Sequence, residues 1–178
     1  MRLFALTAAA AALASVAAPA FAQDTTATTT ATGTFTGLRA GGLVGTGGNK
    51  FVDFDGQTVG IDAGYDVEIG NGGVIGVGVE YQTDIGSNFL DVNESAVLAR
   101  VGGLASANTL VYASGGYTRV SNGATPFNDN GEDGYRVGLG VEHRIGVSGL
   151  ALKLEQRYLS YGHGVDAFQT VGGVGFHF

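Results

Sequence analysis

The sequence contains no cysteine, so its fold does not depend on a disulfide. Basic residues are also scarce, with nine Lys and Arg against sixteen Asp and Glu and a formal net charge of −7. Because no basic cluster is large enough to neutralise phosphates, nucleic acid is excluded as a partner. Beyond the first 22 residues, no segment approaches the ~20 continuous apolar residues of a membrane-spanning helix. If the rest of the chain enters a membrane, it must therefore cross as strands.

The first 22 residues have the pattern of a secretory signal peptide. Arg2 supplies the positive start, Leu3 to Val16 form an alanine-rich apolar run, and Ala20-Phe21-Ala22 is an A-x-A cleavage site. Cleavage after Ala22 would leave 156 of the 178 residues. Residues 23–34 are low in complexity and rich in threonine, which predicts a short disordered lead-in.

From residue 35 to residue 178 the sequence is glycine-rich and alternates with a period of two. This period is typical of strands, and no stretch has a sustained helical period. We predict one all-β domain, an eight-stranded antiparallel up-and-down transmembrane β-barrel. Its expected strands are Phe35–Gly45, Gln57–Glu68, Val74–Asp84, Ser95–Ala105, Leu110–Val120, Tyr135–Ile145, Leu150–Tyr161 and Ala167–Phe178.

The connections between these strands alternate in length. Tight turns are expected at 69–73, 106–109 and 146–149, and longer, more acidic loops elsewhere. Outer-membrane barrels have short periplasmic turns and long extracellular loops. An even strand number then places both ends of the barrel domain on the periplasmic side.

Alternation alone does not say which face is inside, and a soluble lipocalin-like barrel would bury the apolar face. The polar face here carries mainly glycine beside arginine and glutamate, which suits a narrow lumen where ionic side chains need tiny neighbours. The strand at 110–120 is the weakest, and either of its faces could be inner. Aromatic residues of the apolar faces form two expected girdles, which are Tyr65, Tyr112, Phe176 and Phe178 at one rim and Tyr81, Tyr135, Tyr158 and Phe168 at the other.

Charged residues on the inner faces must pair or face trapped water. An eight-stranded barrel is only just wide enough for its own side chains, so we expect a plug of ion pairs. The alternative is a narrow pore lined by the same charges. The expected network is Arg39, Asp62, Glu80, Arg100, Glu142, Glu155 and Arg157, with Asp66, Glu68, Arg136, Arg144 and Lys153 on the same inner faces.

The last nine residues place Val174, Phe176 and Phe178 on one face of a strand. This ending, together with Gly138-Leu139-Gly140-Val141-Glu142 and Leu154-Glu155-Gln156-Arg157-Tyr158, resembles small Gram-negative outer-membrane β-barrels of the opacity-protein and OmpA/OmpX-like group. The resemblance implies a porin-family surface antigen of the outer membrane. It also implies that the final strand is an assembly signal for the barrel-assembly machinery, with Val174, Phe176 and Phe178 as its key residues. Because the barrel strands take up residues 35–178, the resemblance is not expected to extend to a periplasmic peptidoglycan-binding domain or a tether to the cell wall.

What the resemblance implies for function is envelope integrity and surface contact, with membrane lipid and lipopolysaccharide as partners and an unknown extracellular ligand. No cofactor, metal site or catalytic site is expected. The acidic segment 128–133 lacks the spacing of a calcium loop, although its tip could bind cations that bridge lipopolysaccharide phosphates. A lipid A-modifying enzyme is the weaker alternative, since Ser160 and His163 are three residues apart and His143 and His177 have rim and lumen positions.

Overall fold

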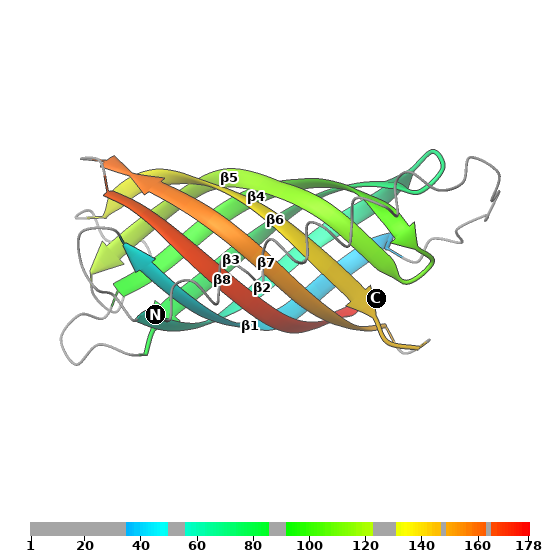
Figure 1. The fold of residues 1–178 in the computed structure, drawn as a ribbon, viewed down its shortest axis with the longest axis horizontal. Coiled ribbons are helices and arrows are strands. Elements are labelled where there is room, and N and C mark those ends of the chain that lie inside the picture. Colours follow the sequence, from blue (N-terminus) through cyan, green and yellow to red (C-terminus); the bar gives the residue numbers. More distant parts are fainter. Residues whose placement is uncertain (1–34, 50–55, 86–91, 123–130, 147–148, 163–164) are drawn as a thin grey trace, which may run out of the picture.

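The computed structural model describes residues 35–49, 56–85, 92–122, 131–146, 149–162 and 165–178, which form a closed eight-stranded β-barrel (Figure 1). Each strand pairs antiparallel with the next, and β1 closes the ring by pairing with β8. The expected signal peptide and threonine-rich lead-in lie outside the described residues. The strands are β1 (Gly37–Asn49), β2 (Gly56–Ile69), β3 (Gly73–Asp84), β4 (Val92–Ser106), β5 (Thr109–Asn122), β6 (Glu132–Arg144), β7 (Leu150–Tyr161) and β8 (Val165–His177).

The strands fall where the alternating pattern predicts them, and most extend further toward the longer loops. The short connections after β2, β4 and β6 gather at the end of the barrel that carries the C label in Figure 1, and we call this end the short-turn rim. The opposite end is the long-loop rim. Gly70 and Gly72 have φ of 58° and 94°, a left-handed conformation that permits the tight turn between β2 and β3.

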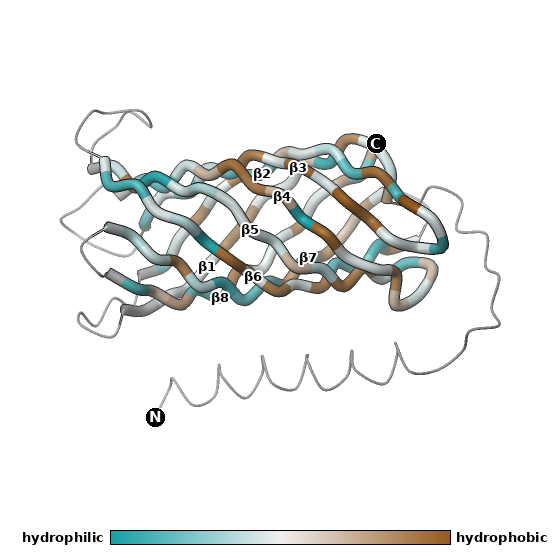
Figure 2. The backbone as a smooth tube through the Cα atoms, turned by 90° about the horizontal axis from the view of Figure 1, so that it is seen from above, coloured by the Kyte–Doolittle hydropathy of each residue, from teal (hydrophilic) through white to brown (hydrophobic). Residues whose placement is uncertain are grey.

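The barrel is apolar outside and ionic inside. Leu139 on β6 is 67% exposed, whereas Asp66 on β2 is 0% exposed and Arg136 is 1% exposed. Figure 2 shows hydrophobic and hydrophilic segments intermixed along the strands, and in β3 the alternation is regular, with Ile75, Val77 and Val79 exposed and Glu80 buried. A water-soluble barrel would reverse this arrangement, so the outer wall is built for lipid. In the described part of the chain, no helix is long and apolar enough to cross a membrane.

Strand β5 resolves the face that the sequence leaves open. Leu110, Tyr112 and Thr118 are buried in the lumen, and Tyr117 lies on the outer wall. The placement of Tyr112 in the outer girdle was therefore wrong. Its ring fits inside because Gly140 lies directly opposite on β6 and leaves room for it.

The other girdle aromatics lie on the outer wall. At the short-turn rim the side chains of Tyr65, Phe176 and Phe178 are exposed, and at the long-loop rim those of Tyr135 and Phe168 are exposed. Tyr158 contacts Phe168 with ring centroids 5.2 Å apart. Aromatic rings at both ends of an apolar wall are typical of a barrel that spans a bilayer.

Candidate functional site in the barrel lumen

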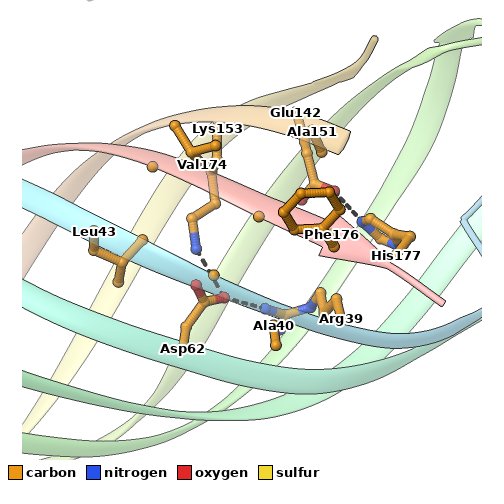
Figure 3. A pocket seen from close by; sticks show the side chains of 13 residues that line it. Arg39, Ala40, Leu43, Asp62, Glu142, Ala151, Lys153, Val174, Phe176 and His177 are labelled. Carbon is orange, nitrogen blue, oxygen red and sulfur yellow. Dashed lines mark hydrogen bonds and ion pairs between the residues drawn. The ribbon is translucent and has the colours of Figure 1, made fainter. Parts of the chain in front are cut away.

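One half of the lumen, toward the short-turn rim, centres on Asp62 of β2. Arg39 Nη1 of β1 lies 2.5 Å from Asp62 Oδ2, and Lys153 Nζ of β7 lies 3.1 Å from the same oxygen (Figure 3). Arg39 Nε also lies 3.1 Å from Asp66 Oδ2. The two carboxylates of β2 thus share the guanidinium of β1.

Asp66 extends this cluster to β4, β6 and β8. Arg100 donates to both oxygens of Asp66, from Nε at 2.8 Å and from Nη2 at 2.6 Å. Its remaining nitrogen, Nη1, donates to Glu142 Oε2 at 2.7 Å. Glu142 also contacts the His177 imidazole through Nε2. Arg100 therefore connects carboxylates from two strands that are not neighbours in the barrel.

A second cluster lies nearer the long-loop rim, around Glu80 of β3. Arg157 Nη1 and Nη2 donate to its two oxygens at 2.7 and 2.8 Å, and Arg136 Nη1 donates at 2.8 Å. The Gln82 amide donates to the same carboxylate. Arg136 also reaches Glu94 Oε1 at 3.1 Å. Glu80 is thus held by two guanidinium groups while it is 5% exposed.

We call the cluster around Asp62 and Asp66 the lower cluster and the cluster around Glu80 the upper cluster. Glu155 of β7 is the third carboxylate of the upper cluster, after Glu80 and Glu94. It accepts from Arg157 Nε at 3.0 Å, from the Tyr112 hydroxyl at 2.7 Å and from the Ser114 hydroxyl at 2.8 Å. Tyr112 Oη and Ser114 Oγ come from β5, which carries no lumen charge in this cluster. Every strand of the barrel therefore supplies a polar group to the lumen.

The charges nearly balance in each cluster. The lower cluster holds three carboxylates and three cations, and the upper cluster holds three carboxylates and two guanidinium groups. In the upper cluster, neutral donors from Gln82, Tyr112, Ser114 and Thr118 satisfy the additional carboxylate oxygens. Buried charge is tolerated only when it is paired and hydrogen-bonded, and this pattern meets that requirement.

Glycine makes room for these long side chains. A Cβ at Gly64 or Gly78 would lie 2.6 Å from Arg39 Nη2, and a Cβ at Gly138 would lie 2.6 Å from Glu155 Oε1. All three distances are shorter than real Cβ contacts. The glycine-rich inner faces are therefore a packing requirement of the charged lumen.

Two small cavities lie among the described lumen residues. One cavity, lined by Arg39, Asp62, Lys153, Glu142 and His177 among others, has a volume of about 20 Å³ (Figure 3). A second cavity of about 20 Å³ lies between the two clusters, beside Glu80, Arg100 and Glu155. Each has room for about one water molecule.

The seven lumen residues singled out from the sequence all lie in these clusters, joined as Arg39–Asp62, Arg100–Glu142, Glu80–Arg157 and Arg157–Glu155. Asp66, Arg136 and Lys153 had the correct parity but were left out of the predicted network. Glu94 was assigned to a loop because the start of its strand was placed three residues too late. It shares the parity of Arg100, which would have identified it.

The three assembly-signal residues and two of the candidates for an enzyme, His143 and Ser160, lie on the outside of the barrel. Val174, Phe176 and Phe178 are exposed on the outer wall near the short-turn rim. His143 is exposed, with Nδ1 3.0 Å from Thr109 Oγ1. Ser160 faces outward beside Tyr135, its partner on β6.

His163 and residues 128–130 of the acidic segment lie outside the described residues. Within the described ranges, no group of three His, Asp or Glu side chains is placed to hold a metal ion.

An eight-stranded antiparallel barrel with a lipid-facing wall and an ionic lumen is an integral outer-membrane protein. The chain belongs to the outer membrane protein β-barrel domain family, whose model matches residues 8–178. No curated protein matches the sequence significantly.

Solved structures with the same fold are distant in sequence. Neisserial surface protein A (NspA) is 16% identical with a TM-score of 0.55, over 79% of this chain and 96% of that one. The N-terminal β-barrel domain of Pseudomonas aeruginosa OprF is 14% identical with a TM-score of 0.59, over 79% and 96%. The outer membrane enzyme PagL is 12% identical with a TM-score of 0.53, over 79% and 99%. At these identities the likeness shows the fold alone.

Proposed function

We propose that this protein is a non-enzymatic structural component of the outer membrane, with a lumen closed by ion pairs and a long-loop rim available for surface contacts. The observation that carries the proposal is the cross-lumen network, in which six carboxylates and five cationic side chains pair with one another. The two cavities beside it have volumes of about 20 Å³ each. A hydrated ion needs more space than either cavity provides.

The closed lumen favours a plug over a passive pore. Arg157 and Glu80 meet across the barrel, and Arg100 joins Asp66 to Glu142 at another level. An ion crossing the membrane would have to separate at least one of these pairs. Separation leaves uncompensated charge in a confined lumen, which costs about 3–5 kcal/mol for a buried pair.

Single-channel recording of the folded protein in planar bilayers tests this proposal. We expect no discrete conductance steps from the unmodified protein. Steady steps that disappear on Glu80→Ala or Arg100→Ala would instead support the selective pore. Asn108→Ala, in an exposed turn, serves as the control for insertion and handling.

Export and assembly belong to the same proposal. We assign Met1–Ala22 to a signal peptide cleaved after Ala22, and Val174, Phe176 and Phe178 to recognition by the barrel-assembly machinery. The apolar outer wall supports lipid and lipopolysaccharide as neighbours. The intact mass of the protein purified from outer membranes tests the cleavage, since any other N-terminus gives a different mass.

We assign surface contacts to the long-loop rim. One structure with the same fold is named a surface protein, NspA. The rim that carries the longer connections includes acidic and aromatic side chains, among them Asp133 and Tyr117, which are hydrogen-bonded to each other. Comparison of whole cells with and without the protein for binding to defined surfaces tests this role.

A lipid A-modifying enzyme is a second candidate because PagL, an outer membrane enzyme, has the same fold. The outward position of Ser160 is compatible with a lipid substrate. Mass spectrometry of lipid A from cells expressing the protein separates the two functions. Unchanged lipid A supports the structural role, whereas a mass change that is lost in Ser160→Ala supports the enzyme.

A further inference from the structure

The chain places an aromatic side chain inside the lumen at the short-turn rim. Phe35 precedes β1 and is 0% exposed. Its ring joins an apolar cluster with Val74, Leu110 and Tyr112, all on inner faces of the barrel. The sequence pattern predicted Phe35 as the first residue of the strand, so this position is a finding of the structure.

Two contacts of the backbone hold Phe35 in this position. The Phe35 N–H donates to Glu68 Oε1 at 2.7 Å, and the Glu68 N–H donates to Thr36 Oγ1 at 2.9 Å. Glu68 of β2 therefore binds the segment from both its side chain and its main chain. These two hydrogen bonds hold residues 35 and 36 against the short-turn end of β2.

The ring has polar neighbours as well as apolar ones. It meets the His177 imidazole edge to face, with centroids 5.4 Å apart and planes at 81°. The Arg144 guanidinium carbon lies 5.8 Å from the ring centroid. Both arrangements are favourable for an aromatic ring. These contacts also connect Phe35 to β6 and β8, two strands that contribute no residue to the apolar cluster.

Gly37 makes the return of the chain possible. Its φ is +131°, which L side chains rarely adopt, and a Cβ at this position would collide with the Phe178 carbonyl oxygen. The Phe178 N–H donates to the Leu38 carbonyl at 2.8 Å, so the ends of β1 and β8 meet here. The chain leaves the wall and enters the mouth of the lumen at this glycine.

We infer that Phe35 is a stopper that seals the short-turn mouth of the lumen, next to the lower cluster of ion pairs. This mouth faces the periplasm in barrels of this class. The inference deepens the proposed closed lumen and rests on it for its functional consequence, namely that water and ions meet two barriers in series. Without the ring, Val74 and Leu110 would line an open apolar recess.

Thiol accessibility tests the stopper. The chain has no native cysteine, so Val74→Cys introduces a single reporter behind the Phe35 ring with little change in volume. The folded protein in lipid vesicles is treated with a charged methanethiosulfonate reagent, in the native and Phe35→Ala backgrounds. We expect modification to be faster by about tenfold or more in Phe35→Ala, because exposure controls the reaction of a thiol.

Two comparisons make the result specific. Asn71→Cys, in the exposed turn between β2 and β3, should react at the same rate in both backgrounds. Phe35→Leu keeps apolar volume in the mouth and should retain most of the protection of Val74→Cys. Heat-dependent electrophoretic mobility verifies that each variant is folded before labelling.

The outcomes separate this inference from the proposed function. Equal modification of Val74→Cys with and without Phe35, whether slow or fast, would overturn the stopper. Conductance tests the ion-pair plug, whereas thiol labelling tests the stopper. The Phe35→Ala variant should remain non-conducting, because the two clusters of ion pairs are still present. Conductance in the unmodified protein would overturn the plug whatever the labelling shows.

Discussion

Glu80 on β3 and Arg157 on β7 lie four strands apart in a ring of eight and are joined across the lumen by two hydrogen bonds of 2.7 and 2.8 Å. The pair therefore spans the barrel from one wall to the opposite one. A bond between neighbouring strands adds to a ladder that the backbone already forms. A bond between opposite strands instead fixes the cross-section of the barrel.

Removal of Glu80 should destabilise the barrel strongly. Glu80→Ala leaves Arg157 and Arg136 without their shared carboxylate, and breaking a buried pair in this way costs about 3–5 kcal/mol. The measurement is the free energy of unfolding in urea for protein folded into lipid vesicles. Asn108→Ala should lie within about 0.5 kcal/mol of the unmodified protein. A loss below about 1 kcal/mol for Glu80→Ala would show that Arg157 finds another partner or water.

Inner and outer glycines should respond oppositely to a methyl group. In Gly138→Ala the new Cβ would lie 2.6 Å from Glu155 Oε1 and 2.8 Å from Ser114 Oγ, so a loss of about 1–3 kcal/mol is expected. In Gly172→Ala, on the lipid-facing side of β8, the Cβ meets nothing within 4 Å. That variant should be neutral or slightly more stable, because alanine restricts the unfolded chain. The same urea titration compares the two, and equal losses would contradict the packing role of the inner glycines.

The sequence predicted the fold well because one periodicity carries most of the information. In a lipid-embedded barrel, successive side chains of a strand face hydrocarbon and the polar lumen in turn. The polarity of each residue in a strand such as β3 therefore predicts its face, with Ile75 and Val77 outside and Glu80 inside. The prediction of Tyr112 failed because β5 carries apolar and hydroxyl side chains on both faces. Its position depends on the space that Gly140 leaves on the neighbouring strand.

Which lumen charges pair with one another was harder to predict than which residues face inward. Parity places Asp62 and Asp66 inside, but only the register of β1 on β2 brings both within reach of Arg39. Pairs across the lumen depend also on the stagger of the closed ring, which no single strand encodes. Phe35 shares the parity of Arg39, yet its place in the mouth depends on the left-handed turn at Gly37.

Charge on the outer wall should be costly in proportion to its depth. Leu139 is in the middle of β6 and is 67% exposed, so Leu139→Arg should weaken folding into lipid vesicles by about 2–4 kcal/mol. Tyr135 lies on the same face of the strand near the long-loop rim, and Tyr135→Arg should cost about 0–1 kcal/mol. Equal effects of the two substitutions would place the bilayer elsewhere on the barrel.

The last aromatic residue should matter more for assembly than for stability. The side chain of Phe178 is 78% exposed, while its backbone N–H donates to the Leu38 carbonyl. Phe178→Ala keeps this hydrogen bond and removes only an outward ring, so purified protein refolded in detergent should lose no more than about 1 kcal/mol of its free energy of unfolding.

If the barrel-assembly machinery recognises Val174, Phe176 and Phe178, the same variant should nevertheless reach the outer membrane in clearly smaller amounts. The readout is the fraction of heat-modifiable protein in isolated outer membranes. Phe168→Ala, an exposed aromatic of β8 at the opposite rim, is the matched control and should assemble normally. Equal assembly of the two variants would show that the final aromatic is an interfacial anchor like the others, because its position next to β1 would then carry no additional information.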